Sequence, residues 1–261
     1  MNKFFKRITQ KAEGVYKRFR YARFYALKKA TNGMLSPAAY GTLYQLCRAL
    51  PDREIIEVGA ATGTGSIAIA LAMQESGKQS KLITVERCEG GSRQEVGGYA
   101  DNIQLIQQNF ARFGVSDRIT LFPHEITAAN AEALLALLAQ RELAAFIHDA
   151  DGRIDRDFAL FWPILQPGGL IVIDDYVEKI KYRPASERYP HGGIKPMITY
   201  RLLNRFMEWG LFETIRLIDG TNFGRKPLRA DFGRFQPAIC QQIIAQVEQE
   251  RREYLAKNGR S

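Results

Sequence analysis

The feature that most constrains the fold is a glycine-rich turn between a short apolar run and a helix-like segment. Ile55 and Ile56 precede the stretch Glu57-Val58-Gly59-Ala60-Ala61-Thr62-Gly63-Thr64-Gly65-Ser66, and residues 67–73 are all apolar. This order predicts a strand, a tight turn and a helix, as in the first unit of a nucleotide-binding α/β domain. Glycine suits such a turn because a backbone without Cβ can bend sharply and lie against a ligand.

Two cofactors compete for this turn. Gly63-x-Gly65-x-x-Ala68 fits the dinucleotide fingerprint, in which the strand runs straight into the first glycine. Here the strand is expected to end at Glu57-Val58, and the first glycine is Gly59. The acidic-x-Gly-x-x-x-Gly spacing instead resembles the first motif of class I S-adenosylmethionine (SAM) methyltransferases. A turn that binds no ligand is the third interpretation.

The rest of the chain alternates between strand-like and helix-like segments. Strands are expected at residues 54–58, 81–85, 118–122, 145–148, 170–173, 212–218 and within 222–228. Helices are expected at 36–50, 65–75, 101–113, 128–140, 158–165, 196–209 and 236–257, with a turn at 166–169. This order predicts an α/β fold with a Rossmann-like, seven-stranded, mostly parallel sheet and helices on both faces. We expect a basic leader helix over residues 1–35, the main domain over 36–230 and a C-terminal helical extension over 231–261.

Acidic residues gather at the predicted ends of the strands. They are Glu57, Glu86, Asp149, Asp151, Asp174 and Asp175. Ligands bind at the carboxyl ends of parallel strands, so these residues are expected to surround a site. Glu86 can accept two hydrogen bonds from the ribose of an adenosine, which both NAD and SAM contain.

Two groups of acidic residues favour SAM over a dinucleotide as the cofactor. His148-Asp149-Ala150-Asp151 and Asp174-Asp175 follow strands expected to be neighbours, so their carboxylates should converge and repel one another unless a cation intervenes. Such oxygen ligands suit Mg²⁺ or Ca²⁺, and a dehydrogenase needs no such cluster. The alternative is that backbone N–H groups and arginines such as Arg153 or Arg156 hold the carboxylates.

Together these motifs resemble the class I, cation-dependent O-methyltransferases. The segments that carry the resemblance are Glu57-x-Gly59-x-x-x-Gly63, Glu86, residues 146–151, Pro167-Gly168-Gly169 and residues 171–176. Asp-x-Asp after the fourth strand and Asp-Asp-Tyr after the fifth are most similar to enzymes that methylate sugar hydroxyls of macrolide and aminocoumarin antibiotics. The resemblance covers about residues 36–225.

The resemblance implies a role for each matching residue. Mg²⁺ would be held by Asp149, Asp174 and Asp175, and Asp151 would be the general base. SAM would contact the turn and the strand ends through Glu57, Gly59, Ala60, Thr62, Gly63, Ser66, Glu86 and Asp149. Catechol-type members carry a lysine base soon after the fourth strand, where this chain has Gly152 and Arg153. His191, in the loop after the fifth strand, is a second candidate catalytic residue.

The net charge of +9 belongs to the first 30 residues, which hold ten Lys or Arg and one Glu. Phe4, Ile8, Val15 and Phe19 repeat there at helical spacing. A basic amphipathic helix of this kind suits an anionic membrane surface, a second subunit or its own domain; nucleic acid is the least favoured partner. Three scattered cysteines, no apolar run long enough to span a membrane and no export signal favour a cytoplasmic protein, peripheral at the inner membrane face.

The leading hypothesis is a SAM- and Mg²⁺-dependent O-methyltransferase that acts on a hydroxyl of a sugar or glycan precursor. An RNA methyltransferase is motivated by the charge, but the Asn/Asp-Pro-Pro-aromatic motif of amino-methylating enzymes is absent at 148–151. An NAD-dependent oxidoreductase and a non-catalytic adaptor with the same fold remain alternatives. The flanking helices are also able to build a homodimer.

Overall fold

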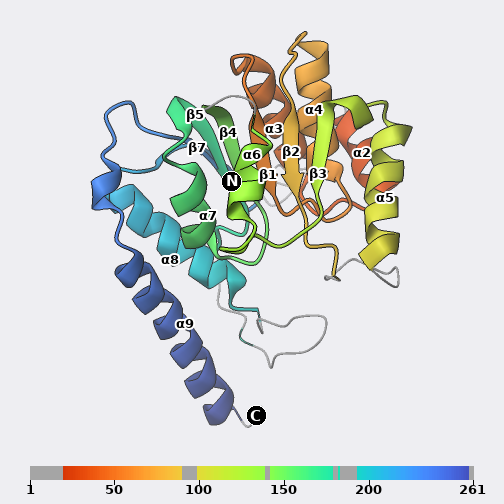
Figure 1. Ribbon diagram of the computed structural model, residues 1–261. Helices are drawn as coiled ribbons and strands as arrows, with labels where there is room; N and C mark the ends of the chain where they lie inside the picture. Colours follow the sequence, from red (N-terminus) through yellow and green to blue (C-terminus); the bar gives the residue numbers. More distant parts are fainter. Residues whose placement is uncertain (1–19, 90–98, 139–141, 179–181, 183–192, 259–261) are drawn as a thin grey trace, which may run out of the picture.

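A computed structural model describes residues 20–89, 99–138, 142–178, 182 and 193–258. Its centre is a seven-stranded sheet with the order β3-β2-β1-β4-β5-β7-β6 (Figure 1). The strands are β1 (Ile55–Val58), β2 (Leu82–Val85), β3 (Ile119–Phe122), β4 (Leu143–His148), β5 (Leu165–Ile173), β6 (Glu213–Ile218) and β7 (Thr221–Arg225). The first five strands are parallel, and β7 runs antiparallel to both β5 and β6. The predicted Rossmann-like, mostly parallel sheet is confirmed.

Helices cover both faces of the sheet. One face carries α2 (Ala22–Thr31), α3 (Pro37–Ala49), α4 (Thr64–Glu75) and α5 (Tyr99–Arg112); the other carries α6 (Ala131–Ala136), α7 (Ile154–Phe161), α8 (Lys195–Glu208) and α9 (Pro237–Lys257). Because side chains alternate along a strand, Ile55 packs into the first layer and its neighbour Ile56 into the second. Parallel strands buried on both faces explain the nearly continuous apolar runs in the sequence.

The described part of the N-terminal segment packs against the main domain. Phe24 and Leu27 of α2 are buried in the same core as α3 and α4. The Thr31 hydroxyl lies 2.6 Å from that of Thr64 at the start of α4. Of the surroundings considered for the leader, residues 20–31 therefore adopt the packing on their own domain, whereas residues 1–19 lie outside the described residues.

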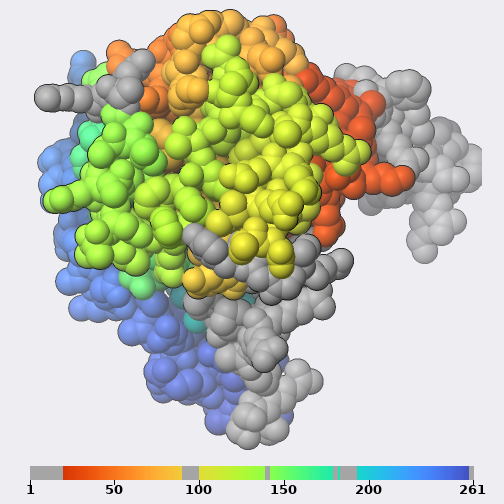
Figure 2. Space-filling model, turned by 45° about the vertical axis from the view of Figure 1, so that its right-hand side comes forward, coloured from red at the N-terminus to blue at the C-terminus, as the bar shows by residue number. Residues whose placement is uncertain are grey.

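The C-terminal helix α9 packs on α7 and α8 with its first half. Cys240, Ile244 and Val247 are buried there, and Gln241 Nε2 donates to Asp155 of α7 at 2.8 Å. The other end of α9 projects away from the sheet (Figure 1), and in the space-filling view it lies at the opposite end of the molecule from α4 (Figure 2). None of the helices in the described ranges is both long and apolar enough to cross a membrane. All three cysteines are buried and free.

Three predicted elements have different bounds in the structure. The helix expected at 158–165 is α7, which begins at Ile154, since the buried positions 154, 158 and 161 already share one helical face. The turn expected at 166–169 forms a bulge inside β5, because Leu165 pairs with Leu143 and the next pair is Leu170 with Ala145. The helix expected at 128–140 is shorter, because Asn130 is held in a preceding turn by hydrogen bonds with Thr127 and Glu125.

Candidate active site

The register of the parallel strands aligns the predicted site residues at one edge of the sheet. Val58 pairs with Val85 of β2 and with His148 of β4, and His148 pairs with Ile173 of β5. The next residues along these strands are Gly59, Glu86, Asp149 and Asp174. All four therefore leave the sheet at the same level, where α/β proteins bind ligands.

The glycines of the turn are required by the backbone itself. Gly59 has φ +97°, and a Cβ on it would lie 2.1 Å from the carbonyl oxygen of Asp149. Gly63 has φ +83° and precedes the first residue of α4, with the Phe110 ring 2.6 Å from where its Cβ would be. Only glycine fits these positions, so the turn can lie tightly on the end of β4.

Glu57 is buried beneath this turn. Its carboxylate accepts hydrogen bonds from the hydroxyls of Ser66 and Thr84, and a Cβ on Gly65 would be only 2.3 Å from its Oε1 atom. Burial raises the pKa of Glu57 to about 7, although the two hydroxyls oppose the shift. Ser66 is fully buried with its hydroxyl on Glu57, so it supports the turn from below.

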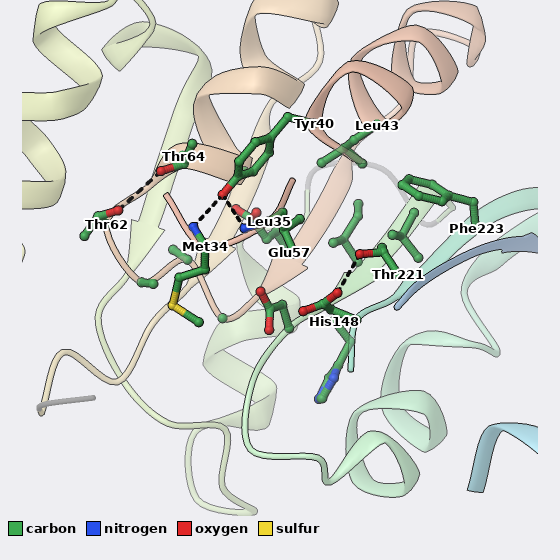
Figure 3. A pocket seen from close by; sticks show the side chains of 18 residues that line it. Met34, Leu35, Tyr40, Leu43, Glu57, Thr62, Thr64, His148, Thr221 and Phe223 are labelled. Carbon is green, nitrogen blue, oxygen red and sulfur yellow. Dashed lines mark hydrogen bonds between the residues drawn. The ribbon is translucent and has the colours of Figure 1, made fainter. Parts of the chain in front are cut away.

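A pocket opens above Glu57 between the turn, α3 and the ends of β4, β5 and β7 (Figure 3). Of the predicted cofactor-binding residues, those that line it are Glu57, Gly59, Ala60, Thr62 and Asp149. Gly63, Ser66 and Glu86 are not among its lining residues in the described part of the chain.

The opposite wall of the pocket includes residues that sequence reasoning missed. The Tyr40 hydroxyl accepts hydrogen bonds from the backbone N–H groups of Met34 (3.0 Å) and Leu35 (3.2 Å), as the dashed lines in Figure 3 mark. Burial raises the pKa of Tyr40, so its hydroxyl stays neutral. This wall is built by the loop between α2 and α3 and by the first turns of α3, whose sequence carries no motif that would have indicated a ligand.

Glu86 ends β2 beside the turn. Its carboxylate accepts hydrogen bonds from the backbone N–H groups of Ala61 (2.6 Å) and Cys88 (3.3 Å). Burial raises its pKa, against the effect of these donors. The carboxylate therefore joins the turn to the chain after β2, and its contact with ribose stays a prediction.

Three carboxylates converge next to the pocket. One oxygen from each of Asp149, Asp174 and Asp175 lies within 4.8 Å of the others. Burial, followed by repulsion from neighbouring carboxylates, raises the pKa values of Asp149 and Asp174. Thr221 of β7 donates to Asp174 at 2.5 Å, and Asp175 has φ +58°, an uncommon backbone conformation for a residue with a side chain. We refer to these three residues as the acidic cluster.

An ammonium group that the sequence did not indicate contacts the acidic cluster. Lys195, the first residue of α8, places Nζ 3.1 Å from Asp149 Oδ1 and 2.7 Å from Asp175 Oδ2. Its side chain passes Gly152, where a Cβ would lie 3.1 Å from Lys195 Cγ. Burial lowers the pKa of Lys195, but the carboxylates outweigh it and raise the pKa, so the ammonium is charged.

Asp151 belongs to a different group of side chains. It accepts from the backbone N–H of Arg153 at 2.9 Å, and Arg156 Nη1 lies 3.3 Å from its Oδ2 atom. Arg156 also holds the fully buried Asp157, whose Oδ2 atom is 3.0 Å from His148 Nε2. For Asp151 the structure thus shows the alternative to metal binding, in which a backbone N–H group and an arginine hold the carboxylate. Its role as general base stays a prediction. His191 lies outside the described residues.

The acidic cluster has the chemistry of a site for a hard divalent cation. Its donors are carboxylate oxygens, which Mg²⁺ and Ca²⁺ prefer, and two strand ends hold them close together. Lys195 supplies one positive charge against three carboxylates, so the described side chains leave negative charge there. The residues therefore fit the predicted metal.

A comparison with protein families matches the segment that carries the site. A family model described as a methyltransferase domain matches residues 56–176, from β1 to just beyond β5 and including the turn, Glu86 and the acidic cluster. A search of curated proteins found no significant match.

Solved structures with similar folds include three methyltransferases. The SAH-bound methyltransferase PaMTH1 of Podospora anserina has a TM-score of 0.58 and 15% identity, over 84% of this chain and 95% of that one. The O-methyltransferase TomG of Streptomyces achromogenes, in complex with SAM, has a TM-score of 0.55 and 16% identity, over 80% and 89%. The O-methyltransferase of Bacillus cereus, in complex with SAH, has a TM-score of 0.52 and 15% identity, over 79% and 90%.

The fold is therefore that of the class I methyltransferases. The segment that carries the pocket matches a methyltransferase domain, in agreement with the prediction of a SAM-dependent methyltransferase.

Proposed function

We propose that the protein transfers the methyl group of SAM to a hydroxyl of a sugar or glycan precursor, with a divalent cation, Mg²⁺, in the acidic cluster. The observation that carries this proposal is that Asp149 and Asp174 both line the pocket and belong to the acidic cluster. The pocket proposed for the methyl donor SAM and the proposed cation site thus share Asp149 and Asp174.

The pocket has the features that the methionine end of SAM requires. The turn gives it a backbone that can lie against a ligand, and Asp149 offers negative charge to the ammonium and sulfonium groups of SAM. Several similar folds carry SAM or SAH in their solved structures, which supports the same donor here.

The acidic cluster suits the acceptor. A hydroxyl is a poor nucleophile at neutral pH, and a bound divalent cation would hold and polarise it. Asp151 or His191 would then take its proton. The protein's largest contribution is to hold the acceptor oxygen in line with the methyl group, an effect that reaches roughly 7–11 kcal/mol in favourable cases.

Methyl transfer from isotope-labelled SAM tests the proposal. Purified protein is incubated with a panel of free sugars, nucleotide sugars and catechols, with MgCl₂ or with a chelator. We expect transfer to at least one sugar hydroxyl, strongly reduced by the chelator and by Asp174→Asn. Transfer that is unaffected by both changes would remove the cation from the proposal, and transfer to catechols alone would remove the sugar acceptor.

We also propose that the basic leader, residues 1–30, binds an anionic membrane surface and brings the enzyme to a membrane-associated acceptor. Its support is the +9 charge of these residues and the helical spacing of their apolar side chains. Cosedimentation with vesicles of phosphatidylglycerol and phosphatidylcholine tests it. Binding should fall with salt and on removal of residues 1–19; equal binding to neutral vesicles would contradict it.

A further inference from the structure

Lys195 is a cationic residue in contact with the acidic cluster that neither the motifs nor the proposed reaction uses. It reaches Asp149 and Asp175 from α8, which follows both of them in the sequence and belongs to a different layer from the turn. Its role has to be derived from its contacts.

The position of Lys195 is not explained by its own helix. It is the first residue of α8, where the partial positive charge of the helix N-terminus disfavours a cation. Its side chain is 21% exposed, so most of it has left water as well. Only the attraction of the carboxylates compensates for both costs, and the ammonium is therefore bound to the acidic cluster.

The local backbone also makes room for this side chain. Gly152, with φ +86°, lies so close to Lys195 that its Cβ would be 3.1 Å from Lys195 Cγ and 3.4 Å from Cα. The loop after β4 is thus shaped to let the lysine pass to Asp149. This close packing indicates a specific contact between α8 and the acidic cluster.

The ammonium and a divalent cation would be held by the same carboxylate groups. Mg²⁺ binds carboxylate oxygens at about 2.1 Å, and Nζ already contacts Asp149 Oδ1 and Asp175 Oδ2 at ion-pair distances. Two cations bound to the same carboxylate groups lie close together and repel each other, so the binding of one disfavours the binding of the other.

We propose that Lys195 is the resident cation of the acidic cluster and that a divalent metal enters the cluster only by displacing it. Lys195 then sets the metal affinity of the enzyme: it stabilises the cluster without metal and weakens metal binding by competition. The inference rests on the proposed cation site.

Calorimetric titration of MgCl₂ into the full-length protein, with saturating SAH, tests this competition. The proteins compared are the wild type, Lys195→Met, Lys195→Gln and Lys195→Arg, with Lys257→Met as a matched control. Lys257 is exposed on the last turn of α9 and contributes the same charge. We expect Lys195→Met and Lys195→Gln to bind Mg²⁺ about tenfold more tightly or better, whereas Lys195→Arg and Lys257→Met resemble the wild type.

Thermal unfolding gives a second measurement that does not depend on activity. Without metal, Lys195→Met should melt below the wild type, because three carboxylates lose their counter-charge. Mg²⁺ should then raise its melting temperature by more than it raises that of the wild type. Retained SAH binding reports whether each variant keeps its fold.

Two results would overturn the inference. One is Mg²⁺ binding that is unchanged or weaker in both Lys195→Met and Lys195→Gln while SAH still binds. The other is the absence of Mg²⁺ binding in all variants; if methyl transfer from SAM persists in that case, the methyltransferase stands and only the cation site fails. Loss of methyl transfer and of SAH binding in the wild type would instead overturn the proposed function.

Discussion

The backbone of Gly59 lies directly against the carbonyl group of Asp149, so that a Cβ on Gly59 would be 2.1 Å from the Asp149 carbonyl oxygen. The same two residues line the pocket. The turn after β1 and the first carboxylate of the acidic cluster are therefore a single packed unit, and a change in one position is felt in the other.

Gly59→Ala should destabilise the fold by more than about 3 kcal/mol, because the new methyl group would collide with backbone and φ is +97°. Urea unfolding measures the loss. Gly77→Ala is the control: φ is +74° there, but nothing lies within 4 Å of the added Cβ. It should cost only about 1–2 kcal/mol. Equal losses for the two variants would refute the close contact with Asp149.

Glu57→Gln should change how stability depends on pH. Burial raises the pKa of Glu57 to about 7 in the folded state, from 4.5 as its ordinary value. Between these values the unfolded chain releases a proton that the folded protein keeps, so the wild type loses stability as pH rises from about 4.5 to about 7. Above this range the loss is constant.

Glu57→Gln has no carboxyl group at this position, so its free energy of unfolding does not fall in this way as the pH rises. Its stability relative to the wild type should rise through the same pH range, by at most about 3 kcal/mol. Urea unfolding at pH 5.0, 6.0 and 7.5 measures the difference. A difference that stays constant over these pH values would show that Glu57 is ionised in the folded state throughout.

Arg156→Met should destabilise the protein by about 3–5 kcal/mol, because it leaves the fully buried Asp157 carboxylate with His148 alone. Denaturant unfolding measures the effect. Arg205→Met, which removes an ion pair with Glu208 on the surface of α8, is the control and should cost less than about 1 kcal/mol. If both variants lost less than about 1 kcal/mol of stability, the buried Asp157 carboxylate would not need Arg156 as its counter-charge.

Asp151→Asn should lower the rate of methyl transfer by roughly 10²–10⁴-fold if Asp151 is the general base, with SAH affinity unchanged. Arg156 pairs with this carboxylate at 3.3 Å, so the role requires the acceptor to compete with the arginine. Single-turnover kinetics with labelled SAM give the rate. A rate close to that of the wild type would move the proton transfer to another group, such as His191.

The sheet, and the edge of the sheet at which the site lies, could be predicted from the sequence. Short apolar runs that end in acids identify parallel strands, and the register then aligns Glu86, Asp149 and Asp174 without further information. The bulge in β5 was less accessible, because Pro167-Gly168-Gly169 indicates a turn but not that the strand resumes the same pairing after it.

The partners of the acids could not be predicted as well as their positions. Lys195 is 46 residues from Asp149 in the sequence and reaches it only because α8 begins beside Gly152. Asp151 was grouped with Asp149 because they are two residues apart, yet its side chain turns toward Arg156 at the start of α7. Such contacts depend on where a helix begins, which sequence patterns define poorly.

Calorimetric titration of S-adenosylhomocysteine and then MgCl₂ into the wild type and Asp174→Asn tests the central claim most directly. We expect both proteins to bind S-adenosylhomocysteine, and only the wild type to bind Mg²⁺, since the donor pocket and the acidic cluster share a wall but hold different ligands. Absence of S-adenosylhomocysteine binding to the wild type would contradict the claim that the pocket is a SAM site.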